Sequence, residues 1–386
     1  MRKRSSSVIL ICFYALNLAD STEEVGRYPS RRPFGLLRAG GPPSRSAKLL
    51  YLWQQIGIVI AAILFLYFLS GCNNTSPNEH RRAEILMDTV VEIKVRGAEE
   101  SDIDAAFDEM RRVEAALNRF SKSSELSRIN AGAGKGMMPI SDIMNEVMET
   151  ALRVASKSGG AFDPTIGPAV AIWSEKRGSP PSESELEDAR RHIGWWKIKF
   201  QPGHISLETG MSLNLDAVAK GYVVDRGLDA LRQRGCKAAI INAGGDIGCY
   251  SNEGYPDWTI SVEDAASGST GPVLILRRGA VATSGIGRRF SVIGGVKYCH
   301  VLDPATMRPV PGNICAASAW APTSALADAW ATAALVRGVK IFEIADIEMT
   351  GMAVKTAEGN WEFNRAWPDR SPDRRPGGPF SRPGRP

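Results

Sequence analysis

A long apolar segment near the front of the chain limits where a globular domain can form. The run Leu49–Leu69 is interrupted only by two glutamines and one glycine, and Arg45 and Lys48 precede it. An apolar run of this length suits a lipid bilayer or an export signal better than the surface of a soluble domain. A soluble domain is therefore expected only in the residues that follow it.

The residues that close this run favour an export signal. Leu69-Ser70-Gly71-Cys72 is similar to the lipobox of bacterial lipoproteins, a resemblance that implies lipid attachment to Cys72 as the first mature residue. The alternative is a plain membrane-anchor helix, because the run is long enough to span a bilayer. Both interpretations place the folded part outside the cytoplasm. In the first, it is lipid-anchored on the periplasmic side of the cell membrane.

The composition of the chain is typical of a globular protein. The 386 residues are 44% hydrophobic and 23% charged, usage that excludes a wholly disordered, collagen-like or multi-span membrane chain. We divide the chain into a leader with a lipoprotein signal peptide (1–72), a linker (73–83), a folded domain (84–364) and a tail (365–386). The tail is basic and rich in Pro and Gly, and we expect it to be disordered.

The basic charge of the chain lies outside the predicted domain. Residues 1–72 carry nine Lys or Arg against three Asp or Glu, and residues 365–386 carry six against two. The intervening residues 73–364 carry 32 basic against 37 acidic residues. A basic face of the kind that binds nucleic acid is therefore not expected, and we predict no nucleic-acid partner.

Hydrophobic periodicity predicts a mixture of helices and strands in the domain. Helices are expected from a cap at Ser101 to Leu117, from Ser141 to a stop at Gly159-Gly160, over Val218–Arg234 and over Ser324–Val336. Strands are expected over Glu84–Val95, Ala238–Ile241, Trp258–Val262, Val273–Leu276 and Lys297–Leu302. Because the elements do not alternate regularly, the pattern predicts an α+β fold rather than a doubly wound sheet.

The domain contains four cysteines, which are Cys236, Cys249, Cys299 and Cys315. None belongs to a Cys-x-x-Cys pair, so the sequence offers neither a zinc site nor a thioredoxin-like motif. Disulfides in an oxidising compartment and buried free thiols both remain open.

Four short segments place polar groups in turns. They are Gly160–Pro168, which contains Asp163; Asn242–Asp246, with two consecutive glycines; Ala282–Gly285, with two hydroxyls; and His300-Val301-Leu302-Asp303-Pro304. Rigid turns and glycines can bring a backbone close to a bulky ligand. Taken singly, each segment is better explained by ordinary turn chemistry than by a site.

The alanine-rich helix predicted over Ser324–Val336 carries a stronger signal. Asp328 and Thr332 are four residues apart and therefore leave the same helical face. A carboxylate and a hydroxyl suit a hard cation such as Mg²⁺. The alternative is a solvated Asp and a Thr bonded to the preceding turn. The surrounding residues are apolar, which makes an unpartnered carboxylate costly and favours a functional role.

Read in order, these segments resemble the ApbE family, the FAD:protein FMN transferases. The matching pieces are Met87-x-Thr89, Ser123–Asn130, Gly160–Pro168, Leu215–Asp225, Asn242–Asp246, Ala282–Gly285, His300–Pro304 and Ala327–Thr332. The resemblance covers roughly residues 84–350. It implies an α+β fold with largely antiparallel sheets and helices around a flavin cleft.

The resemblance also implies an activity and its partners. Family members split FAD at the pyrophosphate, transfer FMN to a Thr or Ser hydroxyl of a target protein as a phosphoester, and release AMP in a magnesium-dependent reaction. The acceptor is typically a subunit of a membrane redox complex. Extracytoplasmic lipoproteins are common in the family, which agrees with the similarity around Cys72.

Carried over to this sequence, the resemblance assigns roles to individual residues. Mg²⁺ would be held by the backbone carbonyl of Ala217 and the side chains of Asp328 and Thr332. His300 and Asp328 would be the catalytic residues, and His300 would serve acceptor binding or proton removal. The residues that would line the FAD site are Met87, Phe120, Ala161, Phe162, Asp163, Asn214, Lys220 and His300.

The sequence departs from the family pattern at three positions of interest. Asn214 stands where the family usually has Asp, and Asp88 and Met307 replace usual glycines.

Two other functions remain as alternatives. One is a Mg²⁺-dependent FAD pyrophosphatase, in which water replaces the protein hydroxyl, and the other is a flavin-binding lipoprotein without catalysis.

Overall fold

The computed structural model describes residues 79–173, 178–263, 270–287 and 290–368. The predicted leader, with the apolar run and Cys72, lies outside these residues, as do residues 369–386 of the predicted tail. The boundary predicted at residue 365 was wrong, because Trp367 packs into a core cluster of the domain. The first strand, β1 (Glu79–Leu86), begins within the segment predicted as a linker. The folded part therefore starts earlier than the sequence pattern indicated.

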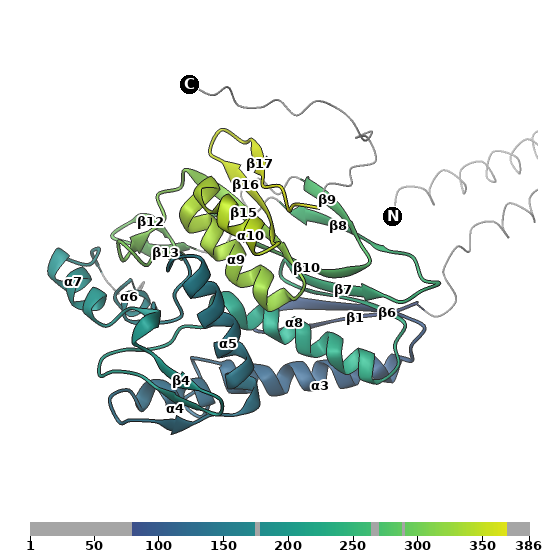
Figure 1. Ribbon diagram of the computed structural model, residues 1–386, viewed down its shortest axis with the longest axis horizontal. Helices are drawn as coiled ribbons and strands as arrows, with labels where there is room; N and C mark the ends of the chain where they lie inside the picture. The colour runs from purple at the N-terminus through teal and green to yellow at the C-terminus, as the bar shows by residue number, and fades with distance from the viewer. Residues whose placement is uncertain (1–78, 174–177, 264–269, 288–289, 369–386) are drawn as a thin grey trace, which may run out of the picture. The chain divides into compact units, whose positions relative to one another are not determined.

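An eight-stranded antiparallel sheet forms the centre of the domain (Figure 1). Its strand order is β1-β2-β6-β7-β10-β15-β16-β17. After β1, the strands in chain order are β2 (Thr89–Arg96), β6 (Ala238–Ala243), β7 (Asp246–Ser251), β10 (Arg278–Gly285), β15 (Ile314–Ala321), β16 (Gly351–Thr356) and β17 (Trp361–Phe363). Every neighbouring pair is antiparallel, which confirms the predicted α+β class.

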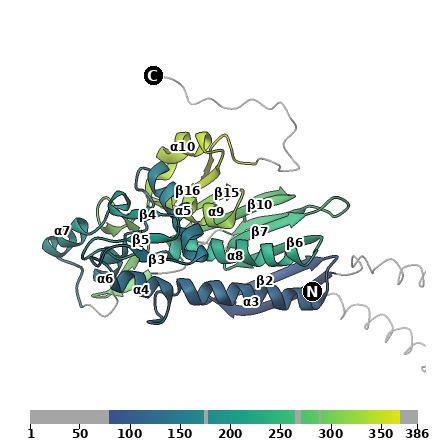
Figure 2. The same cartoon turned by 60° about the horizontal axis from the view of Figure 1, so that its bottom comes forward.

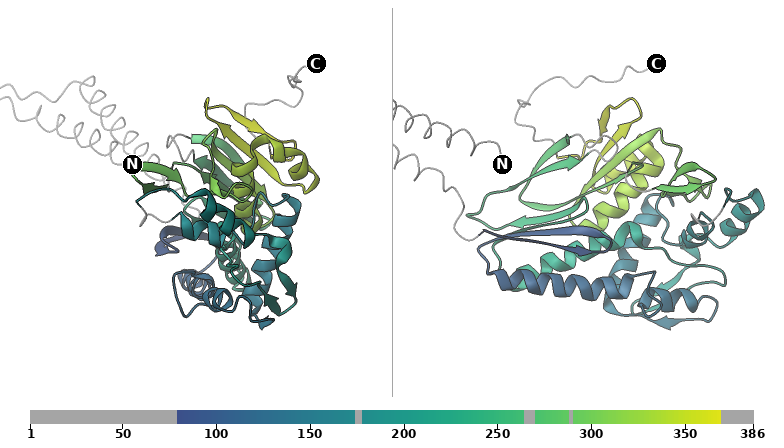
Figure 3. Two further views of the ribbon diagram at one scale, coloured as in Figure 1. Left: turned by 90° about the vertical axis from the view of Figure 1, so that its left-hand side faces the viewer. Right: turned by 180° about the vertical axis from the view of Figure 1, so that it is seen from behind.

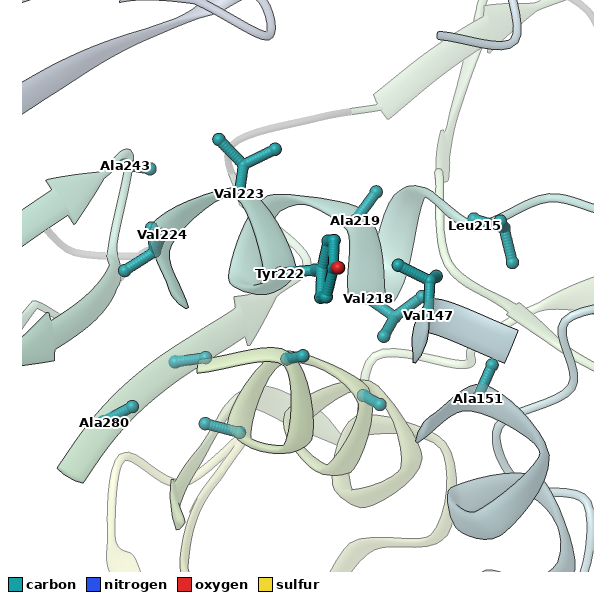
Figure 4. Close-up of a cluster of buried hydrophobic side chains, with 14 of the residues drawn as sticks. Val147, Ala151, Leu215, Val218, Ala219, Tyr222, Val223, Val224, Ala243 and Ala280 are labelled. Carbon is teal, nitrogen blue, oxygen red and sulfur yellow. The ribbon is translucent and has the colours of Figure 1, made fainter. Parts of the chain in front are cut away.

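Four helices cover one face of this sheet, as Figures 1 and 2 show. They are α3 (Glu100–Leu117), α5 (Asp142–Lys157), α8 (Asp216–Gln233) and α9 (Ser324–Arg337). The alternate residues Val91, Ile93 and Val95 of β2 are buried toward them. Figure 4 shows Val147 of α5 beside Val218 of α8 within this core.

Small side chains bring α9 close to the sheet. Six of the fourteen residues of α9 are buried alanines, and the inward residues Ala317, Ala319 and Ala321 of β15 face them. Since alanine fills little space, the helix backbone can lie near the strand backbones. The polar side chains of α9 are thereby held close to the strand ends.

The opposite face of the sheet is covered by a two-stranded ribbon, visible from behind in Figure 3. It consists of β8 (Trp258–Glu263) and β9 (Thr270–Leu276). Trp258, Ile260 and Leu274 pack there against Val281 and other outward residues of the sheet in a second core cluster.

Smaller elements complete the domain. They are α4 (Glu125–Ala131), β3 (Met138–Pro139), α6 (Gly167–Ile172), α7 (Glu183–Arg191), η1 (Trp195–Lys197), β4 (Lys199–Gln201), β5 (His204–Ser206), β11 (Phe290–Ile293), β12 (Val296–Cys299), β13 (Leu302–Asp303), β14 (Arg308–Pro309), η2 (Gly338–Ile341) and α10 (Phe342–Ile347). Ile293, Leu302 and Trp173 share a third, separate cluster.

The strand predicted over Glu84–Val95 is in fact a hairpin. Strands β1 and β2 are joined by a tight turn at Met87 and Asp88, which have φ of 50° and 56°. Two residues at positive φ are what a tight hairpin turn requires. The prediction was wrong because apolar and β-branched residues continue on both sides and only Asp88 marks a turn.

Two other boundaries differ from the prediction. Helix α3 is capped by Glu99, which forms a capping box with Asp102, and Ser101 lies inside the helix. The strand predicted over Lys297–Leu302 ends at Cys299, and Leu302 belongs to a separate pairing with β14. A hydrogen bond from the Val301 N–H to the Cys299 sulfur bends the chain between them.

Other predictions are confirmed. Helix α5 is capped by Ser141, Gly159 and Gly160 follow it at positive φ, and α8 and α9 match their predicted ranges within two residues. The four cysteines of the domain are free thiols. Within the described ranges, none of the helices is long and apolar enough to cross a bilayer.

Candidate active site

A cavity of about 1490 Å³ opens at one edge of the main sheet. Its wall includes Thr89 at the start of β2, Ala243 at the end of β6, Asp246 at the start of β7 and Gly285 at the end of β10. These termini share one edge because neighbouring strands run in opposite directions. Helices α8 and α9 reach the same edge and contribute Ala217, Lys220, Asp328 and Thr332 to the wall.

A lysine between two carboxylates is the most polar feature of the cavity. The Lys220 ammonium forms a short contact with Asp246 and lies 3.4 Å and 3.5 Å from the two carboxylate oxygens of Asp328. Asp246 and Asp328 are each 3% exposed. One ammonium thus faces two buried carboxylates, which leaves one negative charge uncompensated when both carboxylates are ionised.

This excess charge is visible in the acid–base properties of the cluster. Burial, the largest cause, and the neighbouring Asp246 carboxylate together raise the pKa of Asp328 to about 7 against the lowering effect of Lys220. Burial lowers the pKa of Lys220, but the two carboxylates outweigh it and raise the pKa above its usual value. A second cation at Asp328 would therefore be favoured electrostatically.

The backbone of α8 is distorted where the predicted carbonyl ligand lies. Ala217 has φ −91° and ψ 16° inside the helix. The Gly221 N–H, which would bond the Ala217 carbonyl in a regular α-helix, donates to the Asp328 carboxylate at 3.2 Å. The distortion directs the start of α8 toward α9, and the Ala217 residue lines the cavity.

Thr332 completes the group of oxygen atoms on α9. Its hydroxyl lies 3.1 Å from the hydroxyl of Ser284 on β10, and it lines the cavity together with Asp328. The four-residue spacing predicted that these two side chains share a helical face, and the structure places both in one wall.

These residues fit a hard divalent cation. The described part of the chain holds no group of three or more His, Cys, Asp or Glu side chains suited to a metal. The available set is one carboxylate, one hydroxyl and one backbone carbonyl, on Asp328, Thr332 and Ala217. Mg²⁺ prefers oxygen ligands and retains several waters or substrate phosphates, so an incomplete set of protein oxygens beside uncompensated negative charge suits it.

Asp163 holds a turn in the cavity wall. One carboxylate oxygen accepts hydrogen bonds from the Thr165 N–H at 2.8 Å and the Thr165 hydroxyl at 2.6 Å, and the other accepts the Trp195 N–H at 3.1 Å. Burial raises the pKa of Asp163 despite these bonds. The neighbouring residues Ala161 and Phe162 are buried and line the cavity.

The mouth of the cavity carries an exposed aromatic ring. Phe120 is 70% exposed, and the Arg119 guanidinium lies 4.0 Å from its ring centroid. Arg119 also forms a 2.8 Å ion pair with Asp216. Asn214 lines the same region, where its side-chain oxygen accepts the Asp216 N–H at 3.0 Å. A planar ligand could stack on this ring.

His300 follows directly after β12 and lines the cavity. The residue is exposed. The nearby Asp303 carboxylate accepts the Ala305 N–H at 2.8 Å and shapes the turn that follows. Ser291 and Tyr298, which face each other on β11 and β12, line the cavity beside it.

Of the residues predicted for the site, Met87 alone is absent from the cavity wall. Its N–H donates to Glu114 at 2.8 Å, and its side chain packs against the main core. Two residues that the prediction did not select, Asp246 and Ser284, contact Lys220 and Thr332. Both lie in motifs noted in the sequence, but no local pattern indicates these long-range contacts.

The two residues that stand where the family usually has glycine, Asp88 and Met307, both have positive φ. Asp88 has φ 56° and Met307 has φ 59°, in the left-handed region that glycine adopts without steric cost. Met307 is buried, and its carbonyl accepts the Trp173 indole N–H at 2.7 Å. The backbone geometry at these positions is thus the one that favours glycine, although this chain carries side chains there.

Comparisons with known sequences agree with this geometry. The model of the ApbE family matches residues 87–354. A FAD:protein FMN transferase of Treponema pallidum is 28% identical over 315 residues, covering 74% of this chain and 86% of its own length. One from Vibrio cholerae is 28% identical over 324 residues, covering 79% and 96%.

Solved structures show the same architecture. The ApbE protein of Thermotoga maritima superposes with a TM-score of 0.69 at 25% identity and covers 75% of this chain and 97% of its own. The flavin transferase ApbE from Vibrio cholerae gives 0.66 at 25% identity, covering 75% and 98%. With its α+β fold and its cavity at the sheet edge, this chain belongs to the ApbE family.

Proposed function

We propose that this protein transfers FMN from FAD to a Thr or Ser hydroxyl of a target protein and releases AMP. The observation that carries the proposal is the cluster of Lys220, Asp246, Asp328 and Thr332 in the wall of a cavity of about 1490 Å³. Phosphoryl transfer depends on positioning and charge neutralisation, and this cluster offers a fixed cation and a place for a second one. The relatives named FAD:protein FMN transferase support the same reaction.

The reaction forms one bond and breaks another at the phosphorus of the FMN half of FAD. The acceptor hydroxyl oxygen bonds to this phosphorus, and the bond from phosphorus to the bridging oxygen breaks, so AMP leaves with that oxygen. The hydroxyl proton must be removed. We assign this role to His300, because imidazole accepts protons near neutral pH and His300 lines the cavity.

Lys220 serves the phosphate groups in this scheme. Its ammonium is anchored by Asp246, which keeps it charged and directed into the cavity. Ala217, Asp328 and Thr332 would hold Mg²⁺, which when bound neutralises phosphate charge. Phe120 offers a surface for an aromatic ring, while Ala161 and Phe162 form a buried part of the wall.

The proposal is tested with the purified full-length protein in detergent. It is incubated with FAD, MgCl₂ and a candidate acceptor from a membrane redox complex, and the acceptor is analysed by intact mass. A mass gain equal to FMN supports transfer. Release of free FMN and AMP without acceptor modification supports the alternative pyrophosphatase, and bound but unchanged FAD supports a flavin-binding protein without catalysis.

We also propose that the protein is lipid-anchored through Cys72 outside the cytoplasm. The apolar run Leu49–Leu69 followed by Leu-Ser-Gly-Cys supports this. A Cys72→Ala variant should lose labelling by a fatty-acid probe and retain its uncleaved leader. Unchanged labelling of this variant would contradict the lipid anchor and leave a membrane helix as the alternative.

A further inference from the structure

We propose that Asp225 is a positioning residue that sets the spacing of the Mg²⁺ ligands by locking α9 onto α8, an inference that rests on the proposed function. Asp225 lies on α8, two turns after Ala217, and does not line the cavity. Its role follows from the hydrogen bonds that its carboxylate accepts.

The Asp225 carboxylate binds the first turn of α9. One oxygen accepts the Ser324 N–H at 2.7 Å, and the other accepts the Ala325 N–H at 2.9 Å. The first N–H groups of a helix have no partner within the helix, and a carboxylate also interacts favourably with the helix dipole there. One side chain of α8 therefore fixes both the position and the direction of the start of α9.

A second contact runs in the opposite direction between the same helices. Asp328 lies one turn into α9, and its carboxylate accepts the Gly221 N–H of α8 at 3.2 Å. The two carboxylates thus make reciprocal contacts, each from one helix to the backbone of the other. With only one of these contacts, α9 could pivot on α8. The two contacts together fix the position of α9 along α8.

Glycine makes this close approach possible. A Cβ atom at position 221 of α8 would clash with the backbone carbonyl of Ser324 on α9. One at position 248 of β7, in the sheet beneath, would lie 2.5 Å from the Ser324 hydroxyl. The helices therefore cross with their backbones in contact at Ser324. A crossing without intervening side chains has little freedom to adjust when one of its contacts is lost.

The junction of α8 and α9 also sets the spacing of the oxygen atoms proposed to bind the cation. Ala217 and Lys220 lie on α8, whereas Asp328 and Thr332 lie on α9, so their spacing depends on how the two helices are joined. Metal affinity is sensitive to groups that orient the ligands, and changing such groups typically lowers it about 10- to 100-fold. Asp225 is such a group, acting from outside the cavity.

The test measures Mg²⁺ affinity directly. The full-length wild-type protein and Asp225→Asn are titrated with MgCl₂ at constant FAD, and the rise in melting temperature gives an apparent Kd. Asparagine keeps the shape, but its amide group directs hydrogens toward one of the two N–H donors. We expect the apparent Kd for Mg²⁺ to rise about 10-fold or more, with FAD affinity measured without Mg²⁺ unchanged.

Thr323→Ala is the matched control. Thr323 caps the same helix through the Leu326 N–H at 3.4 Å but makes no hydrogen bond to α8. Its loss should lower the melting temperature and leave the Kd for Mg²⁺ within about twofold of the wild type. If the loss of Mg²⁺ affinity in both variants simply follows the loss of melting temperature, Asp225 is merely structural and the inference is wrong.

Two further outcomes keep the inference separate from the proposed function. A wild-type protein without any Mg²⁺-dependent stabilisation overturns the proposed metal and the inference with it, whereas normal Mg²⁺ binding by Asp225→Asn overturns the inference alone. If Asp225→Asn does not fold, Asp225→Glu is measured, because it keeps the charge and displaces it by one methylene. An unchanged Kd in that variant also overturns the inference.

Discussion

The junction of α8 and α9 and the rim of the cavity differ in how their side chains are held. At the junction, Asp328 is buried and bonded to a backbone N–H of the neighbouring helix. At the rim, Phe120 and His300 are exposed and lie on short connecting segments. The comparison indicates that the end of the cavity proposed for phosphate chemistry is preorganised, while the end proposed for ring and acceptor recognition is open to solvent.

This arrangement agrees with the demands of the proposed reaction. Charge stabilisation in a transition state is most effective from groups that need not reorganise, and the junction provides such groups. An acceptor protein must bring its hydroxyl to the cavity from outside, which requires an accessible rim. Substitutions at the junction should therefore alter chemistry most, and those at the rim should alter recognition or local stability.

The largest effect is expected at the junction, for Asp328→Asn. This variant removes the negative charge proposed to hold Mg²⁺ while keeping the side-chain shape, so transfer should fall by at least about 10³-fold. Without Mg²⁺ the melting temperature at neutral pH should not fall, because Lys220 retains Asp246 as its partner. Acceptor modification is followed by intact mass, and near-normal turnover would contradict the metal assignment.

His300→Asn tests the rim, with a smaller expected effect. A positioned base contributes roughly 10² to 10⁴-fold to a proton transfer, so transfer should fall within that range at saturating FAD. FAD affinity, measured by flavin fluorescence, should change far less. His204→Asn, at an exposed position on β5, is the control and should behave as wild type. Weakened FAD binding with normal turnover would instead place His300 in the flavin site.

The pH dependence of stability tests the junction without any substrate. Burial raises the pKa of Asp225 to about 6. A raised carboxyl pKa contributes stability that is present below the unfolded value near 4 and is lost as the pH rises through 6. The unfolding free energy of metal-free wild type relative to Asp225→Asn should therefore decrease by roughly 1–3 kcal/mol between pH 4 and pH 7.

Urea unfolding at several pH values measures this difference. The comparison with Asp225→Asn cancels the contributions of other carboxyl groups, including Asp328, whose pKa is also raised. If the two proteins show parallel pH dependence, the carboxyl group of Asp225 is not desolvated in the folded state, and the junction is less tightly closed than the geometry indicates.

The same two regions differ in how well the sequence predicted them. The four-residue spacing of Asp328 and Thr332 predicted a shared helical face, and both line the cavity. This succeeded because helical periodicity is a local property. The contacts of Lys220 with Asp246 and Asp328 span 26 and 108 residues. Such contacts depend on the sheet order, which no local pattern contains.

At the rim, local patterns were misleading even for the backbone. The β-branched residues around Asp88 predicted one strand, although the chain reverses there. Likewise, the strand predicted through His300 ends before it, because Cys299 and Val301 form a bend. Both errors fall where the chain reverses or bends between strands, and the resemblance to the family supplied the site residues that periodicity could not.

The smallest predicted effect concerns the turn between β1 and β2. Asp88 is exposed and adopts φ 56°, a region in which a residue other than glycine costs roughly 1–2 kcal/mol, somewhat less for Asp. Asp88→Gly should therefore raise the unfolding free energy by about 0.5–1 kcal/mol, net of the greater freedom of glycine in the unfolded chain. Asp88→Ala, which keeps a Cβ but loses the tolerance of Asp for this conformation, should be less stable than wild type. Transfer activity should stay within about twofold in both variants, because the turn residues do not line the cavity. A glycine variant less stable than the alanine variant, in urea unfolding at one pH, would show that the turn is not held in the left-handed conformation.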